Sequence, residues 1–182
     1  MFTSVPLPKD DQLPESIKNT LDRLPSLNVF RMLSNVPGSF HSYIDLAKSL
    51  LGDGKFDARL REIAVLRQAH LLKSKYEWHQ HVFLAKTNGV TDDEITIIKK
   101  ENPVTSLGDE ENFMCLISEE LTLNANLSDS TFEQLFTRYS VELGMELILC
   151  LSYVNMLGRF INASRVQIED TNPLDGLASP TN

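Results

Sequence analysis

The chain of 182 residues contains only two cysteines, Cys115 and Cys150. Each lies within a run of apolar residues, and together they do not form a Cys-x-x-Cys pair. A free thiol in such surroundings packs as a small apolar side chain and is unreactive. The alternative, a disulfide or a pair of redox-active thiols, has no support from the spacing. We therefore predict two buried thiols.

Long apolar runs and an excess of positive charge are also missing. No apolar run approaches the roughly 18 residues that cross a bilayer. Residues 1–12 lack the apolar stretch of a secretory signal. We therefore expect a cytoplasmic protein that does not bind membranes. The formal net charge of −8 argues against general binding to nucleic acid, although a local basic patch is compatible with it.

Strand-like alternation is scarce, and no Asn-Gly or Asp-Gly turn joins two β-rich runs. Helical periodicity extends along the chain instead, with short linkers between the periodic segments. The sequence predicts one all-α domain over residues 1–182, with about seven to nine helices and a poorly ordered tail at 170–182. The expected helices span approximately residues 14–24, 27–33, 40–51, 57–72, 75–88, 91–100, 109–124, 130–139 and 141–169.

Capping signals mark several helix ends. Asp57 is the expected N-cap of a helix whose middle is apolar on most sides, which predicts a central, buried position. Gly89 is the expected stop of the following helix. The segments 91–94 and 130–133 both have the capping-box pattern that opens a helix.

One helical face carries side chains that can transfer protons. Ser74, Glu77 and His81 are spaced by three and then four residues, so a helix places them on the same face. A carboxylate close to His81 would raise the pKa of this histidine and make it a general acid or base near neutral pH. An ordinary surface pair has the same spacing, so both interpretations remain open. Metal binding is not favoured, because Glu77 and His81 supply only two ligands.

Glu62 lies on the preceding, apolar helix. A carboxylate there is either at the solvent edge or buried with a partner. The short turn at residues 73–74 makes a meeting of Glu62 and His81 across the helical hairpin geometrically possible. Arg61 and Arg67 are equally good partners, so the sequence does not decide between them.

Polar residues also form a stripe on the long last helix. Asn155, Arg159 and Asn162 share a face of a helix that is otherwise largely apolar. Such a stripe is typical of an interior hydrogen-bonded seam, a subunit contact or an anion-binding wall. Arg159 is the best candidate to hold a substrate carboxylate, because a guanidinium binds a carboxylate through two parallel bonds. A structural salt bridge explains Arg159 equally well.

Several segments together resemble the carboxymuconolactone decarboxylase family. The resemblance is tightest over residues 60–95, within a family core at about 55–100, and covers most of the chain. It implies an alkylhydroperoxidase D-like helical domain with a central helical hairpin and a long C-terminal helix. The segments that carry it are residues 24–33, 60–67, 76–81, 85–89, 91–95 and 153–162.

The sequence departs from the alkylhydroperoxidase D branch of this family at its redox centre. That branch has a Glu, then Cys-x-x-Cys, then a His four residues on. Glu62 and His81 match the outer positions, but Ser74 and Glu77 stand where the cysteines would be. Neither side chain can form the sulfenic acid or disulfide that a thiol peroxidase requires. The resemblance therefore implies the fold without the peroxidase reaction.

The decarboxylase branch is similar to this sequence in its Glu-x-x-x-His, here Glu77 and His81. This similarity implies acid/base chemistry without cofactor or metal on a small carboxylated lactone or related ring acid. His81 would deliver a proton, Glu77 would orient His81, and Glu62 would complete the catalytic set. The expected substrate contacts are Arg159, Asn155, Ser74 and Tyr76.

Family members associate as trimers or hexamers, so the resemblance also implies a homo-oligomer. Three functions remain open at this stage. The first is a decarboxylase- or lactone-type enzyme that uses His81 and Glu77. The second is a residual redox protein of the alkylhydroperoxidase type. The third is a non-catalytic oligomeric module that binds a small acid or a partner protein.

Overall fold

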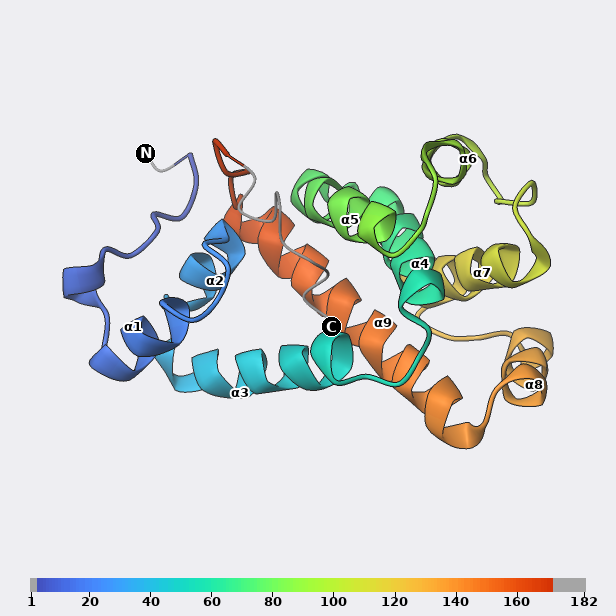
Figure 1. Ribbon diagram of the computed structural model, residues 1–182, viewed down its shortest axis with the longest axis horizontal. Helices are drawn as coiled ribbons and strands as arrows, with labels where there is room; N and C mark the ends of the chain where they lie inside the picture. Colours follow the sequence, from blue (N-terminus) through green and yellow to red (C-terminus); the bar gives the residue numbers. More distant parts are fainter. Residues whose placement is uncertain (1–2, 172–182) are drawn as a thin grey trace.

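The computed structural model describes residues 3–171, and in this part the chain folds into helices without strands (Figure 1). The predicted all-α architecture is confirmed. A 3-10 turn, η1 (Asp10–Gln12), and a π-helical turn, η2 (Lys48–Gly52), accompany the α-helices. The predicted disordered tail lies outside the described residues from position 172 onward. The α-helices are α1 (Glu15–Leu21), α2 (Asn28–Leu33), α3 (Pro37–Ala47), α4 (Ala58–Leu71), α5 (Lys75–Thr87), α6 (Asp92–Lys100), α7 (Asp109–Leu123), α8 (Asp129–Arg138) and α9 (Val141–Ser164).

Helix α4 lies at the centre of the fold. Its predicted N-cap is present, because Asp57 Oδ1 accepts the backbone N–H of Leu60 at 2.8 Å. Every residue from Arg61 to Ala69 is buried, since α4 contacts α5, α6, α7 and α9. A helix that is covered on all sides has no solvent face, which explains its lack of an amphipathic pattern. The sequence-based prediction of a central, buried helix is correct.

A tight turn connects α4 to α5. Lys73 adopts a left-handed backbone conformation with φ of 55°, and the N–H of Ser74 donates to the carbonyl of Ala69 at 2.9 Å. The turn folds α5 back along α4, and the two helices lie side by side in Figure 1. This hairpin brings the middle of α4 next to the middle of α5.

The N-terminal helices cover one side of this hairpin. A second apolar cluster, separate from the main core, joins α1, α2 and α3 to α5 and to the end of α9. Its members include Ile17, Met32, Phe40, Tyr76 and Ile161. In Figure 1, α1 to α3 lie on one side of α9, and α6 to α8 lie on the other side. Residues far apart in the sequence thus enclose the face of α5 that carries the candidate site.

Three helix ends differ from the prediction. Helix α3 begins at Pro37, before the predicted start at residue 40, and Pro37 occupies its first turn, where the absence of an N–H costs nothing. The N-cap of α8 is Ser128, whose Oγ accepts the N–H of Thr131, and not Ser130. Helix α9 ends at Ser164, because Arg165 turns into the left-handed region with φ of 58°. The capping box predicted for α6 is present between Thr91 and Glu94.

Helix α9 is long and apolar enough to cross a membrane by length and composition alone, with a mean hydropathy of 1.4 over 18 residues. The expectation that no segment reaches this threshold is therefore wrong. Leu147, Leu151 and Val154 are buried in the main core. A core helix of a folded domain passes the same test, so one such helix is weak evidence for a membrane span.

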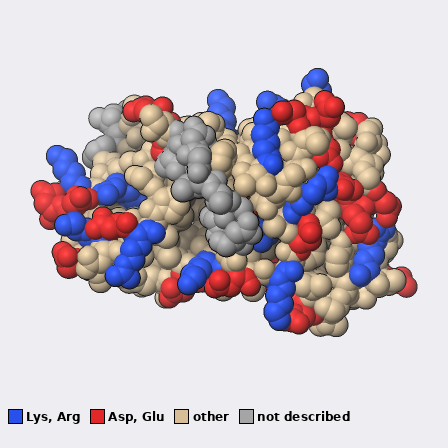
Figure 2. Space-filling model, viewed as in Figure 1, with Lys and Arg blue, Asp and Glu red and all other residues tan. Residues whose placement is uncertain are grey.

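Charged side chains of both signs are spread over the face drawn in Figure 2. On this face, Lys and Arg residues lie singly or in small groups among Asp and Glu residues, without a continuous basic area in the described part. Nucleic acids require such an area, because phosphate contacts dominate their affinity. This face therefore gives no support to a nucleic-acid partner.

Candidate active site

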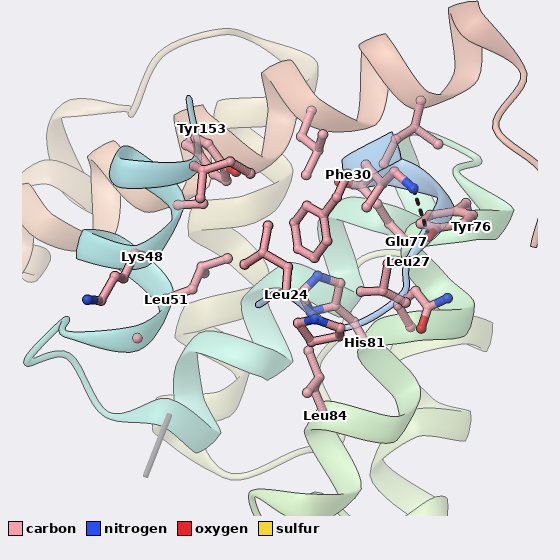
Figure 3. A pocket seen from close by; sticks show the side chains of 18 of the residues that line it. Leu24, Leu27, Phe30, Lys48, Leu51, Tyr76, Glu77, His81, Leu84 and Tyr153 are labelled. Carbon is pink, nitrogen blue, oxygen red and sulfur yellow. Dashed lines mark hydrogen bonds between the residues drawn. The ribbon is translucent and has the colours of Figure 1, made fainter. Parts of the chain in front are cut away.

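A cavity of about 350 Å³ lies between α4, α5, α9 and the N-terminal segment (Figure 3). The loop before α2 and α2 itself cover it, and η2 closes one end. The walls are almost entirely apolar, whereas a few polar side chains gather at the end where α4 meets α5. This combination is typical of small-molecule binding sites. Its apolar lining residues include Leu24, Leu27, Phe30, Leu51, Leu84 and Leu157.

Glu62 and His81 meet at the polar end of the cavity. His81 Nδ1 donates a hydrogen bond to Glu62 Oε2 at 2.7 Å, across the α4–α5 hairpin. Both residues are buried and line the cavity. The bond fixes the ring and leaves Nε2, which has no hydrogen-bond partner among the described residues, available to a ligand. Glu62, and not Glu77 as the resemblance implied, therefore orients the imidazole.

The protonation of His81 follows from these neighbours. Burial opposes the charged imidazolium, but the carboxylate of Glu62 outweighs it and raises the pKa of His81, with a further contribution from Glu77. Arg61 acts in the opposite direction. These neighbours therefore favour the imidazolium form of His81 more than free solution does. It can donate a proton from Nε2 to a group in the cavity.

Glu77 lies at the same end and is nearly inaccessible to solvent, with 2% of its surface exposed. Neither carboxylate oxygen forms a hydrogen bond with any described residue. Burial raises the pKa of Glu77 to about 7, although His81 and the Ser74 hydroxyl oppose this shift. A carboxyl group with this pKa is divided between its neutral and charged forms at neutral pH, so it can either take up or release a proton.

Gly158 allows α9 to approach Glu77. A Cβ atom at this position would collide with Glu77 Oε2 and would come within 2.7 Å of Leu72 Cδ1. The sequence does not show this requirement, since a glycine inside an apolar helix has many explanations. The close approach of the α9 backbone is what removes solvent from the carboxylate of Glu77.

The predicted substrate contacts separate into two groups. Tyr76 lines the cavity, while Ser74 is buried as the residue before α5 but does not contribute to the lining. Asn155 is buried and donates to Thr122 Oγ1 at 3.3 Å outside the cavity. Arg159 is exposed and donates to the backbone carbonyl of Asn155. Of the four, only Tyr76 is in a position to touch a ligand in this cavity.

Other lining residues were not expected from the sequence. Tyr153 on α9 enters the cavity from above in Figure 3, and Gln80 and Arg61 contribute to its polar end. Gln80 follows Tyr76 by four residues, so helical spacing alone places it on the same face. Arg61 directly precedes Glu62, and the sequence suggested only that it neutralises this carboxylate.

Glu169 holds the segment that covers the cavity in place through hydrogen bonds. One of its carboxylate oxygens accepts the Tyr76 hydroxyl and the backbone N–H of Asn28, each at 2.5 Å, and the other accepts Gln80 Nε2 at 2.6 Å. Val29 N–H donates to the Tyr76 hydroxyl at 3.2 Å, the bond drawn in Figure 3. These bonds connect the start of α2 to α5 and hold the N-terminal segment over the cavity.

The two cysteines lie in the main core and away from the cavity lining. Both are free thiols, and burial raises the pKa of Cys115 and of Cys150 to about 12. A thiol becomes a nucleophile only as the thiolate, so neither cysteine is activated. In residues 3–171, no group of three or more His, Cys, Asp or Glu side chains is placed to hold a metal ion.

The helical arrangement has a counterpart among solved structures. Its fold is similar to that of a crystal structure described as the alkylhydroperoxidase AhpD core of an uncharacterized peroxidase-related protein from Ralstonia eutropha JMP134. The two structures superimpose with a TM-score of 0.78 at 15% sequence identity, covering 92% of each chain. The fold is therefore alkylhydroperoxidase D-like.

A second comparison concerns the sequence of part of the chain. Residues 37–101, which comprise α3 to α6, match the model of the Carboxymuconolactone decarboxylase family. The resemblance seen in the sequence is confirmed. The matched segment contains Glu62, Glu77 and His81. A search of curated proteins gave no match.

Proposed function

We propose that this protein is a cofactor-free acid/base enzyme that acts on a small carboxylated lactone or a related ring acid. The observation that carries the proposal is the hydrogen bond of 2.7 Å between His81 and Glu62 at the polar end of an apolar cavity, with Glu77 beside it. Two groups that can exchange protons near neutral pH thus face one ligand-sized space.

The chemistry requires one proton donor and one proton acceptor. His81 donates from Nε2, while Glu62 keeps the ring oriented and stabilises its positive charge, which makes Glu62 a positioning residue. Glu77 in its charged form accepts a proton from carbon, and in its neutral form it returns one. Loss of carbon dioxide from the substrate leaves an electron pair on carbon, and His81 supplies the proton that this carbon takes up.

The apolar walls support this chemistry. A developing carbanion or enolate is not solvated by water in such a cavity, so its stabilisation depends on the fixed charges of His81 and Arg61. The redox alternative lacks a comparable observation, because both thiols are buried and their pKa is raised. The proposal therefore favours proton transfer over peroxide reduction.

Incubation of the protein with carboxylated lactones and ring acids in deuterium oxide tests the proposal. Proton transfer at carbon introduces carbon-bound deuterium, which proton NMR detects whether or not carbon dioxide is lost. We expect incorporation for at least one acid, at a rate that depends on enzyme concentration. If the whole set shows neither deuterium incorporation nor carbon dioxide release, while the same acids bind, the enzyme proposal is wrong and a binding module is favoured.

The exposed face of α9 supports the proposal that the protein self-associates. Val141, Met145, Leu149 and Met156 form a row along this face and are each about half exposed or more. Monomeric proteins seldom leave such a continuous apolar row in water. We propose that a second copy of the chain covers it.

A Met145→Lys/Leu149→Lys variant is expected to sediment as a monomer at concentrations where the unaltered protein is oligomeric. Two buried charges in an apolar contact have no partners, so association becomes unfavourable. Phe132→Lys, at an exposed position on α8, is the control and should leave the oligomer intact. A monomeric unaltered protein, or an oligomer that survives both changes on α9, would contradict this assignment of the interface.

A further inference from the structure

Arg61 is a buried cation of the cavity whose side chain lacks hydrogen-bond partners in the described part of the chain. Its side chain is 3% exposed and lines the polar end. Its guanidinium forms no hydrogen bond with any residue in the described range 3–171, and its Nε atom is buried without a partner. The nearest opposite charge is Glu62 Oε1, at 3.6 Å from Nε. A guanidinium carries five N–H donors, so burial in this state is costly.

Arg67, on the same helix, shows how a buried guanidinium is normally accommodated. It is inaccessible to solvent, and its nitrogen atoms donate to Glu119, Asn102 and two backbone carbonyls at 2.8–3.1 Å. Arg61 has none of these compensations although it is buried to nearly the same degree. The difference indicates that the partner of Arg61 is not among residues 3–171.

The charges at the polar end favour an anion as this missing partner. The carboxylate of Glu62 is shared, since Oε2 accepts from His81 while Oε1 faces Arg61. Arg61 and His81 therefore share one carboxylate, and Glu77 adds a full negative charge only when it is deprotonated. A ligand carboxylate would give the Arg61 guanidinium an anionic partner of its own.

The rest of the cavity is unsuited to a second charge. Beyond the polar end the walls are formed by apolar side chains from the N-terminal segment, η2, α5 and α9. Lys48 is the other cation of the lining and lies at the far end in Figure 3, with its amino group directed away from His81. A charged group in the middle of the cavity would lose its hydration without gaining a partner.

We propose that the cavity binds a monocarboxylic acid with an apolar body, and that the Arg61 guanidinium holds its carboxylate beside His81. A carboxylate presents two oxygens in one plane, which match two parallel N–H donors of a guanidinium. A phosphate would bring more negative charge against Glu62. Arg61 thus takes the role that the sequence suggested for Arg159, which is exposed.

Binding of the acid by Arg61 is independent of the proposed function, but the consequence of this binding for the reaction rests on that function. Pairing with the guanidinium stabilises the carboxylate in the ground state, so a monocarboxylic acid held in this way keeps its carboxylate, and the loss of carbon dioxide described above does not take place. The reaction is then a proton shift on the neighbouring carbons. One proton goes from carbon to the charged Glu77 and another from His81 to carbon, with no oxidant or further reactant.

Calorimetric titration with ω-phenylalkanoates, from phenylacetate to 5-phenylpentanoate, tests the assignment apart from catalysis. For the best acid of the series, we expect the matching neutral amide to bind at least about tenfold more weakly, as expected for loss of a charge-assisted pair. A matched diacid, 1,4-phenylenediacetate, should also bind more weakly. Equal affinity for acid and amide, equal affinity for the diacid, or no binding by any acid of the series would overturn the proposal.

Variants of Arg61 test whether this residue causes the preference for the acid over the amide. Arg61→Gln should reduce the affinity for the acid by about tenfold or more and leave that for the amide nearly unchanged. Arg61→Lys keeps the charge but not the two parallel N–H donors. Its affinity for the acid should therefore lie between those of Arg61→Gln and the unaltered protein. Arg159→Gln, outside the cavity, is the matched control and should bind like the unaltered protein. An Arg61→Gln variant that is folded by circular dichroism and still prefers the acid contradicts the assignment.

Binding and turnover separate this inference from the proposed function. Preferential binding of the acid through Arg61, without deuterium incorporation into any acid, would contradict the acid/base enzyme and retain the binding site. Turnover that persists in Arg61→Gln with an unchanged KM would contradict the role of Arg61 and retain the enzyme.

Discussion

A His81→Asn variant is expected to lose about 10²–10⁴-fold in the rate of deuterium incorporation, because it removes the general acid. The amide of asparagine reaches part of the space of the imidazole but cannot release a proton near neutral pH. The effect should fall on kcat more than on KM, since Arg61 and the apolar walls still hold the ligand. The rate of incorporation, followed by NMR at several substrate concentrations, separates the two constants.

Two further variants keep this result interpretable. His81→Asn leaves Glu62 buried with only Arg61 nearby, and an uncompensated charge of this kind costs about 3–5 kcal/mol. The Glu62→Gln/His81→Asn double variant replaces the pair with neutral amides and should be as inactive as the single variant. The Cys115→Ala/Cys150→Ala variant should retain activity. A double His81 variant with normal turnover, or loss of turnover in a folded cysteine variant, would reverse the assignment.

The α4–α5 hairpin was predictable because its determinants are local. Asp57 caps α4 through its own first turn, and Gly89, with φ of 85°, follows the end of α5. The pairing of Glu62 with His81 was only one of several possibilities. The length of the turn permits it, but the choice between His81, Arg61 and Arg67 depends on how α6 and α7 pack against α4. Arg67 is drawn to Glu119 of α7 and is therefore unavailable to Glu62.

The position of Arg159 was not predictable from its helix. α9 carries large apolar residues on both its buried and its exposed face, for example Leu151 and Met156. A helix with two apolar faces does not reveal which one points into the core, because amphipathicity is the signal that orients a helix. Tertiary packing rotates Arg159 to the surface. The cover of the cavity was hidden for a related reason, since Glu169 joins α2 to α5 over a long sequence separation.

Glu77→Gln is expected to stabilise the protein by about 3 kcal/mol at pH 8 and to have little effect near pH 4.5. The folded-state pKa of Glu77, about 7, lies above the value of 4.5 for the free side chain. Between these values the folded state binds the proton that the unfolded state has lost. Stability therefore decreases by about 1.4 kcal/mol per pH unit as the pH rises through this window, and the loss is complete above pH 7.

Glutamine has nearly the same shape and no titratable proton, so the variant should not show this loss. Urea denaturation at pH 5 and at pH 8 gives the free energy of unfolding of both proteins, and their difference should grow with pH. Glu133→Gln, an exposed position on α8, measures the effect of removing one negative charge from the surface. His81 also makes the protein less stable as the pH rises, since its raised pKa favours the folded state at low pH. The part of this contribution that comes from Glu62 remains in the Glu77→Gln variant. A difference between the two proteins that is constant from pH 5 to pH 8 would mean that Glu77 is charged in the folded state throughout. Glu77 would then act only as a base.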